Sequence, residues 1–233
     1  MSIKYYAHRG IFNNQTIFEN SMTAFKKALE KGVGIELDVR MTKDKVLIVH
    51  HDANLMRLFQ TNLNIKDLTY VALCQFKFDD EPIPTLKDVL DIVAGQVPII
   101  IEIKDGHNRN VICYETAKLL DGYKGVFLVE SFDPLIVRWF KKHRPSFKRG
   151  QLLMPSKKYA KRFQGILMRT HITHLITKPD FYAYEVTLGK NFLSRFFLKH
   201  FAKEICIWTV KPDSTLNFNA DYIIFEDPSL IKM

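Results

Sequence analysis

Apolar runs that turn polar at their ends recur along the chain and alternate with segments of helical periodicity. Nine of these runs predict strands, at residues 3–8, 34–40, 46–51, 97–104, 125–131, 148–154, 173–177, 204–210 and 220–225. Continuous apolar runs are typical of parallel strands that are covered by helices. Between the runs, Thr85 with Asp88 and Asp133 before Pro134 mark helix starts. The alternation predicts an α/β fold around a parallel sheet.

The spacing of the runs separates sheet strands from other segments. Runs 34–40 and 46–51 are too close to be parallel neighbours, which need a crossover of about a dozen residues. We therefore take 34–40 as the barrel strand and predict that 46–51 is a hairpin-like extension or an irregular segment. The long segment 52–83 predicts a small insertion over the mouth of the sheet. Residues 211–219 contain Pro212 and two asparagines, so we predict that an outer helix there is shortened or missing.

Acidic residues gather at the polar ends of two of these runs. Strand alternation puts Glu36 and Asp38 on one face of their run, and it puts Glu102 and Lys104 together on another. Carboxylates that converge repel each other and resist desolvation unless a cation lies between them. Oxygen ligands without a thiolate cluster favour a hard divalent ion, Mg²⁺ or Ca²⁺.

Two histidines and two cations occupy similar positions. His8 and His51 end apolar runs and suit proton transfer near neutral pH. Arg9 and Lys104 supply fixed positive charge, which suits a phosphoryl group. His50 points to the opposite face, and we interpret it as structural. The pattern predicts a metal-dependent enzyme that acts on a phosphate.

These residues belong to motifs that extend along nearly the whole chain. The motifs are His8-Arg9-Gly10 with Glu19-Asn20-Ser21 and Ala24-Phe25, Glu36-Leu37-Asp38-Val39, His51-Asp52 with Leu55 and Arg57, Pro84-Thr85-Leu86, Glu102-Ile103-Lys104, Ser131-Phe132, and Trp208-Thr209-Val210. In this order they resemble the glycerophosphodiester phosphodiesterase family of TIM-barrel enzymes. The resemblance implies one (β/α)8 barrel over residues 1–233, which hydrolyses glycerophosphodiesters to sn-glycerol 3-phosphate and an alcohol.

The resemblance also implies roles for individual residues. It makes His8 and His51 the general acid and base, and it makes Arg9, Lys104 and Trp208 contacts to the phosphate or the substrate. The implied metal ligands are Glu36, Asp38 and Glu102. For Trp208, a core position on a buried strand is an equally good interpretation.

Two further parts of the family pattern bear on the edge of the site. Asn20 precedes a helical periodicity and is interpreted as its N-cap, whereas Glu19 either approaches the site or orients its loop. The family usually ends its last strand with Thr-Asp shortly before a proline, and this chain has Phe225-Glu226-Asp227-Pro228. That departure affects the rim of the pocket, where the alcohol moiety of the substrate would bind.

Composition narrows the class of protein. Hydrophobic residues make up 47% and charged residues 25% of the chain, as in ordinary globular proteins. Three widely spaced cysteines argue against a disulfide framework. We find no signal-peptide pattern before His8 and no apolar stretch that could cross a bilayer, and so expect a cytoplasmic protein.

The net charge of +9 favours anionic partners. Basic clusters at 141–144 and 157–162 are interpreted as solvated helix faces, so we do not expect nucleic-acid binding. The segment 188–203 combines an apolar arc with basic residues; it could rest weakly on an anionic membrane, but an outer barrel helix explains the same pattern. The arc comprises Phe192, Leu193, Phe196, Phe197 and Phe201, and the basic residues are Arg195, Lys199 and Lys203.

Two other functions fit the same constellation. A barrel phospholipase that cleaves an intact lipid headgroup would use similar histidines. A non-catalytic barrel that binds phosphometabolites would need the cations, but the histidine pair argues against it.

Overall fold

Eight parallel strands close into a barrel. The computed structural model describes residues 4–104, 108–158, 165, 168, 170–190, 192–216 and 219–231. The barrel strands are β1 (Lys4–His8), β2 (Gly34–Met41), β6 (Ile99–Ile103), β7 (Phe127–Ser131), β8 (Arg149–Leu153), β9 (Phe181–Glu185), β10 (Glu204–Val210) and β11 (Tyr222–Phe225). β1 pairs with both β11 and β2, and this closes the sheet. The fold is the expected (β/α)8 barrel.

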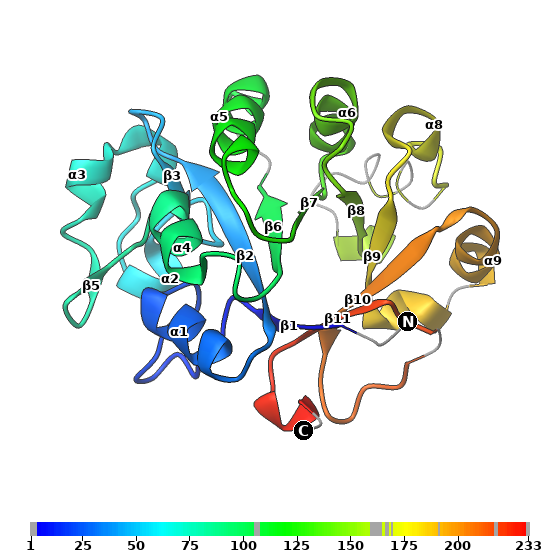
Figure 1. The fold of residues 1–233 in the computed structure, drawn as a ribbon, viewed down its shortest axis with the longest axis horizontal. Helices are drawn as coiled ribbons and strands as arrows, with labels where there is room; N and C mark the ends of the chain where they lie inside the picture. Colours follow the sequence, from blue (N-terminus) through cyan, green and yellow to red (C-terminus); the bar gives the residue numbers. More distant parts are fainter. Residues whose placement is uncertain are drawn as a thin grey trace.

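Helices lie outside the strands (Figure 1). They are α1 (Met22–Glu30), α4 (Leu86–Val93), α5 (Arg109–Asp121), α6 (Pro134–His143), α8 (His174–Thr177) and α9 (Phe192–Phe201). Thr85 and Asp88 form the predicted capping box of α4, and Asp133 caps α6 by accepting from the Leu135 N–H. Both helix starts are therefore where the sequence predicts them.

The inside of the barrel is filled by large side chains that need two glycines. Tyr6 and Phe181 are completely buried there. A Cβ on Gly34 would lie 2.5 Å from the Tyr6 ring, and one on Gly150 would lie 2.2 Å from the Phe181 ring. Because neither ring has room to withdraw from a packed interior, both positions favour glycine.

The hairpin-like extension and the insertion that the sequence predicts are both present. β3 (Leu47–Val49) pairs antiparallel with β2, which confirms 46–51 as an extension. The insertion 52–83 contains α2 (Met56–Phe59), η1 (Ile65–Asp67), α3 (Tyr70–Leu73), β4 (Lys77–Phe78) and β5 (Glu81–Pro82). Its buried residues Leu55, Ile65 and Leu73 form a small core together with Ile83 and with Ile48 of β3.

One strand prediction is wrong. Residues 173–177 do not form a strand, because 174–177 form the short helix α8. Lys178 ends this helix with φ +41° and precedes Pro179, which cannot continue a helix. The strand is β9, which contains Phe181, Tyr182 and Tyr184, and aromatic side chains favour strands as much as branched ones do.

The connection from β10 to β11 lacks a helix in its described residues, 211–216 and 219–221. This agrees with the predicted loss of an outer helix. Short 3-10 turns complete the chain, namely η2 (Ser156–Lys158), η3 (Val186–Lys190) and η4 (Pro228–Leu230). The basic cluster 157–162 lies partly outside the described residues, as do the side chains of Phe192, Leu193, Arg195 and Lys199 in the apolar arc.

Candidate active site

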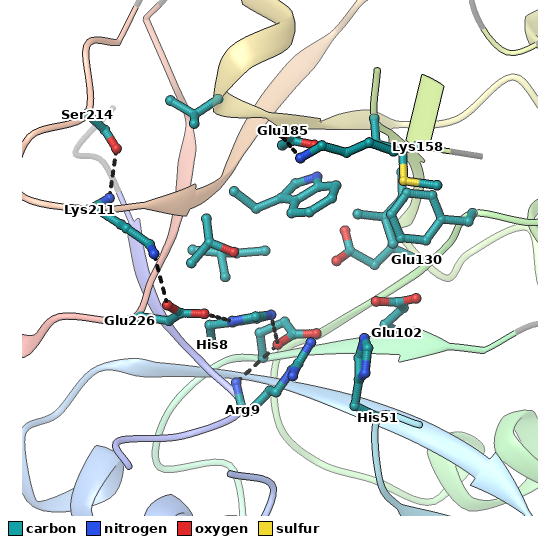
Figure 2. Close-up of a pocket in the computed structure, with 18 of the residues that line it drawn as sticks. His8, Arg9, His51, Glu102, Glu130, Lys158, Glu185, Lys211, Ser214 and Glu226 are labelled. Carbon is teal, nitrogen blue, oxygen red and sulfur yellow. Dashed lines mark hydrogen bonds and ion pairs between the residues drawn. The ribbon is translucent and has the colours of Figure 1, made fainter. Parts of the chain in front are cut away.

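A cavity of about 780 Å³ opens at the carboxyl ends of the barrel strands. Figure 2 shows its labelled side chains, which come from segments far apart in the sequence. The chain turns sharply after β1, where Arg9 has φ +57° and Gly10 has φ +81°. A Cβ on Gly10 would lie 2.8 Å from Ala24, so this turn requires glycine both for its conformation and for its close approach to α1.

Three buried carboxylates converge beside this cavity, and two of them, Glu36 and Glu102, line it. Glu36, Asp38 and Glu102 each offer an oxygen within 4.8 Å of the others. Strand pairing explains the approach, because Asp38 of β2 lies directly opposite Glu102 of β6. The predicted ligand trio therefore converges, and its hard oxygen donors fit a divalent cation such as Mg²⁺ or Ca²⁺.

The charges in this cluster are strongly coupled. Lys104 places Nζ 2.7 Å from both Asp38 Oδ1 and Glu102 Oε2. Burial and the neighbouring Asp38 raise the pKa of Glu36 well above its usual value. Burial opposes ionisation of Asp38 too, but Lys104 and Arg9 hold its pKa well below the ordinary range. The cluster thus keeps one fixed anion between two cations and retains acidic groups that a further cation would stabilise.

Arg9 ties the site to the loop before α1. Its Nε lies 3.1 Å from Asp38 Oδ2, and its Nη1 donates to Glu19 at 2.7 Å. Arg57 of the insertion also donates to both oxygens of Glu19, at 2.8 and 2.7 Å. Burial would raise the pKa of Glu19, but the two guanidinium groups lower it to about 2. Glu19 thus pairs with both arginines beside the site.

Asn20 does not cap α1, contrary to the sequence interpretation. Ser21 is the N-cap and accepts from the Ala24 N–H at 3.1 Å. Asn20 has φ +58° and donates from Nδ2 to Asp38 Oδ2 at 2.8 Å. The left-handed conformation, which asparagine tolerates better than most residues, turns its side chain toward the carboxylate cluster.

The two predicted histidines are each held by a carboxylate. His8 Nδ1 lies 2.9 Å from Glu226 Oε1, and His51 Nδ1 lies 2.7 Å from Asp52 Oδ1. A carboxylate acceptor keeps the proton on Nδ1, so Nε2 retains its lone pair. Burial lowers the pKa of both rings, that of His51 to about 4. Burial thus favours the neutral form of each ring, which can accept a proton at Nε2.

His50 has the structural role that the sequence predicts. Its side chain is buried, and its ring stacks on Phe59 with centroids 6.4 Å apart. Burial lowers its pKa to about 4. It does not belong to the cavity wall, whereas the adjacent His51 does.

The opposite wall of the cavity is mostly apolar. Trp208 lies edge-on to Phe132, with ring centroids 5.6 Å apart, and Leu152, Met154 and Val186 extend this wall. Trp208 thus lines the cavity as the resemblance implies, and it is half-buried. At the rim, Lys158 Nζ pairs with Glu185 Oε1 at 2.8 Å.

Sequence reasoning missed several polar residues of the cavity. Glu130, Glu185 and Arg40 line it, as does Glu226, which the sequence assigned to the rim without a role. Glu130 lies opposite Glu102 in the β6–β7 register, and burial followed by the charge of Glu102 raises its pKa well above the usual value. A signal was available, because Glu130 interrupts an apolar strand just as Glu102 does.

The fold and the site together define a (β/α)8-barrel protein with a buried acidic centre between two carboxylate-held histidines. Residues 8–217 match the sequence model of the glycerophosphoryl diester phosphodiesterase family. The chain belongs to this family.

Individual relatives agree over parts of their length. The glycerophosphodiester phosphodiesterase of Caldanaerobacter subterraneus subsp. tengcongensis is 34% identical over 163 residues, which are 63% of this chain and 65% of that protein. Lysophospholipase D GDPD1 of Homo sapiens is 36% identical over 135 residues, or 52% of this chain and 41% of that protein. The match to the human protein therefore covers less than half of its length.

Solved structures agree over almost the whole chain. The glycerophosphodiester phosphodiesterase of Thermotoga maritima has a TM-score of 0.71 and 25% identity, covering 97% of this chain and 95% of its own. A phosphodiesterase of Oleispira antarctica, solved with the product sn-glycerol-3-phosphate, has a TM-score of 0.76, covers 95% of this chain and 92% of its own, and is 16% identical. At that identity the second structure supports the fold alone.

Proposed function

We propose that the chain hydrolyses glycerophosphodiesters to sn-glycerol 3-phosphate and an alcohol, with His8 and His51 as the general acid and base. One observation carries the proposal. Both imidazoles line the cavity that Arg9 and Lys104 also line, and a carboxylate fixes each ring. A phosphodiester bound there would have cations for its charge and two proton-transfer groups within the same cavity.

The residues divide the work by their chemistry. Arg9 and Lys104 bind the phosphate and oppose the negative charge that grows in the transition state. One imidazole, in its neutral form, removes a proton from the attacking hydroxyl through Nε2. The other, in its protonated form, donates its Nε2 proton to the departing alkoxide. The attacking hydroxyl belongs either to water or to the neighbouring glycerol carbon. In the second route a cyclic phosphate forms as the alcohol leaves, and water then opens it to give sn-glycerol 3-phosphate. Both routes require one base and one acid.

Glu36, Asp38 and Glu102 would hold a divalent cation, Mg²⁺ or Ca²⁺. When bound, such an ion supplies positive charge to a phosphoryl oxygen and to glycerol hydroxyls. Because it also offsets repulsion among buried acids, saturating Mg²⁺ or Ca²⁺ should stabilise the fold by about 2–3 kcal/mol at 100 times its Kd. Thermal unfolding in EDTA, Mg²⁺ and Ca²⁺ measures this, and a Glu102→Gln variant should lose most of the gain.

The decisive experiment is an assay of sn-glycerol 3-phosphate release. Glycerophosphocholine, glycerophosphoethanolamine and glycerophosphoglycerol should each be tested with Mg²⁺, Ca²⁺ and EDTA. His8→Asn and His51→Asn should each lower kcat by about 10²- to 10⁴-fold, the usual contribution of general acid–base catalysis. His200→Asn is the matched control, because that exposed ring lies outside the cavity and donates from Nδ1 to Phe196 O within its own helix, at 2.7 Å.

Three results would change the conclusion. A folded His8→Asn or His51→Asn protein with full activity removes that histidine from the mechanism. Full activity in EDTA rejects the role of the metal. Binding of glycerol 3-phosphate without turnover of any diester would favour the non-catalytic barrel.

The apolar wall favours a second candidate, cleavage of a lysophospholipid. Phe132, Leu152, Met154 and Val186 would accommodate an acyl chain beside the reacting phosphate. Comparing soluble glycerophosphocholine with lysophosphatidylcholine micelles as substrates separates the two candidates. A higher kcat/KM for lysophosphatidylcholine micelles than for glycerophosphocholine would favour the lysophospholipid as the substrate.

Weak membrane contact through 188–203 stays a prediction. Phe196 and Phe201 are 54% and 51% exposed, while Phe197 stacks on His171 with centroids 3.9 Å apart. Part of the arc therefore packs inward, as a barrel helix requires. None of the helices in the described ranges is long and apolar enough to cross a membrane.

A further inference from the structure

Glu226 reaches His8 from the opposite end of the chain. β1 and β11 are parallel neighbours in the barrel, with Ala7 in register with Phe225. The residues that follow these two positions therefore emerge side by side at the mouth, although they are 218 positions apart in sequence. The residue that follows β11 thus places a carboxylate on a proposed catalytic ring.

The contact resembles the one on the other side of the cavity. His51 is held through Nδ1 by Asp52, and Asp52 is itself bound by Arg57 Nε at 2.6 Å. His8 is held through Nδ1 by Glu226, and Glu226 Oε2 lies 4.0 Å from Lys211 Nζ. In both pairs a cation lies behind the carboxylate. The two histidines consequently have matching support from unrelated segments.

The loop that replaces the last outer helix supplies this cation. The Lys211 N–H donates to Ser214 Oγ at 2.9 Å, which closes a turn at the cavity margin. Figure 2 shows Ser214, Lys211, Glu226 and His8 connected in sequence along one wall. Lys211, in the loop after β10, and Glu226, after β11, therefore belong to one set of contacts.

We propose that Glu226 is the positioning residue of His8, which holds the ring in the Nδ1–H tautomer with Nε2 free for proton transfer. The inference rests on the proposed function for its kinetic consequence. His8 Nε2 lies 3.9 Å from Glu36 Oε2, so the free nitrogen is at the carboxylate cluster, where the phosphate would bind. Without an acceptor at Nδ1, the imidazole could rotate about χ2 or exchange tautomers, and less of the protein would have the reactive arrangement.

The side chain of Glu226 is 37% exposed, so its replacement separates positioning from folding. Glu226→Ala should lower kcat by about 10- to 100-fold, the usual loss for a group that orients a neighbouring ligand or base, and should change KM by less than about threefold. Glu226→Gln keeps an oxygen that can accept from Nδ1–H and should recover most of the lost kcat. Asp227→Asn is the matched control, because Asp227 caps η4 through the Ser229 N–H and asparagine caps equally well.

A double-variant cycle tests whether the effect passes through His8. In a His8→Asn background, Glu226→Ala should cause no further loss of kcat, because the ring that it positions is gone. An equal loss in both backgrounds would overturn the proposal. So would a Glu226→Ala protein whose kcat is within threefold of the wild type.

Imidazole nitrogen NMR gives a readout that does not need turnover. The wild type should show His8 as the Nδ1–H tautomer, and Glu226→Ala should show a mixture or the other tautomer, while His51 is unchanged. An unchanged His8 spectrum in Glu226→Ala rejects the positioning role. If no diester is hydrolysed but the tautomer changes, the proposed function fails and the positioning of His8 by Glu226 stands.

Discussion

The two walls of the cavity are held together by different forces. On the wall from β1, β2 and β6, ionic groups are buried and paired, with Asp38 only 1% and Lys104 only 9% exposed. On the wall from β8 to β10 the surface is apolar, and the ion pair at its rim has Lys158 58% exposed. Buried charges interact strongly and have few alternative partners, whereas exposed ones are screened by water. The first wall therefore holds charged side chains in fixed pairs, and the second supplies an apolar surface.

The difference predicts unequal costs for removing one charge from each wall. Asp38→Asn leaves Lys104 and Arg9 buried with one fewer partner, and breaking a buried ion pair costs about 3–5 kcal/mol of unfolding free energy. Lys158→Met removes an exposed pair and should cost about 0–1 kcal/mol. Urea unfolding of both variants in EDTA measures the contrast without a contribution from metal binding. Equal losses would show that the walls do not differ in this way.

Acid should lower the stability of the protein by weakening the buried ion pairs of Glu19 with Arg9 and Arg57. Its pKa is about 2 in the folded protein and 4.5 ordinarily. A lowered folded pKa adds stability that is fully present above about pH 4.5 and is lost as the pH falls toward 2. The difference corresponds to about 3 kcal/mol. The stability advantage of the wild type over Glu19→Gln should shrink from about this value at pH 7 to near zero at pH 2, and a constant advantage would contradict the assigned ionic role.

The wall from β1, β2 and β6, which carries the buried ion pairs and is here called the ionic wall, was the more predictable part of the molecule. Strand alternation and the meeting of parallel strand ends suffice to bring Glu36, Asp38, Glu102 and Lys104 together, and the structure places them so. The predicted histidines line the same cavity. These positions depend on periodicities that a sequence displays directly.

Contacts that depend on a local turn or on chain closure were less visible. Asn20 faces Asp38 only because of its left-handed backbone, which a helix-start pattern does not reveal. Glu226 meets His8 only because β11 closes the barrel against β1. The strand at 181–185 was missed because its neighbour 173–177 is rich in branched apolar residues. In each case tertiary structure overrides a local preference.

The smallest expected effect concerns the apolar wall, at Trp208. Its indole lines the cavity and contacts Phe132, so replacing it with leucine should remove about 1 kcal/mol of aromatic contact. If Trp208 binds the substrate, Trp208→Leu should raise KM about fivefold while kcat stays within twofold, since 1.4 kcal/mol corresponds to tenfold. If it serves only the core, the melting temperature should fall with KM unchanged. Steady-state kinetics and thermal unfolding of one variant decide between the two interpretations, and a large fall in kcat instead would place Trp208 with the ionic wall and remove the distinction between the walls.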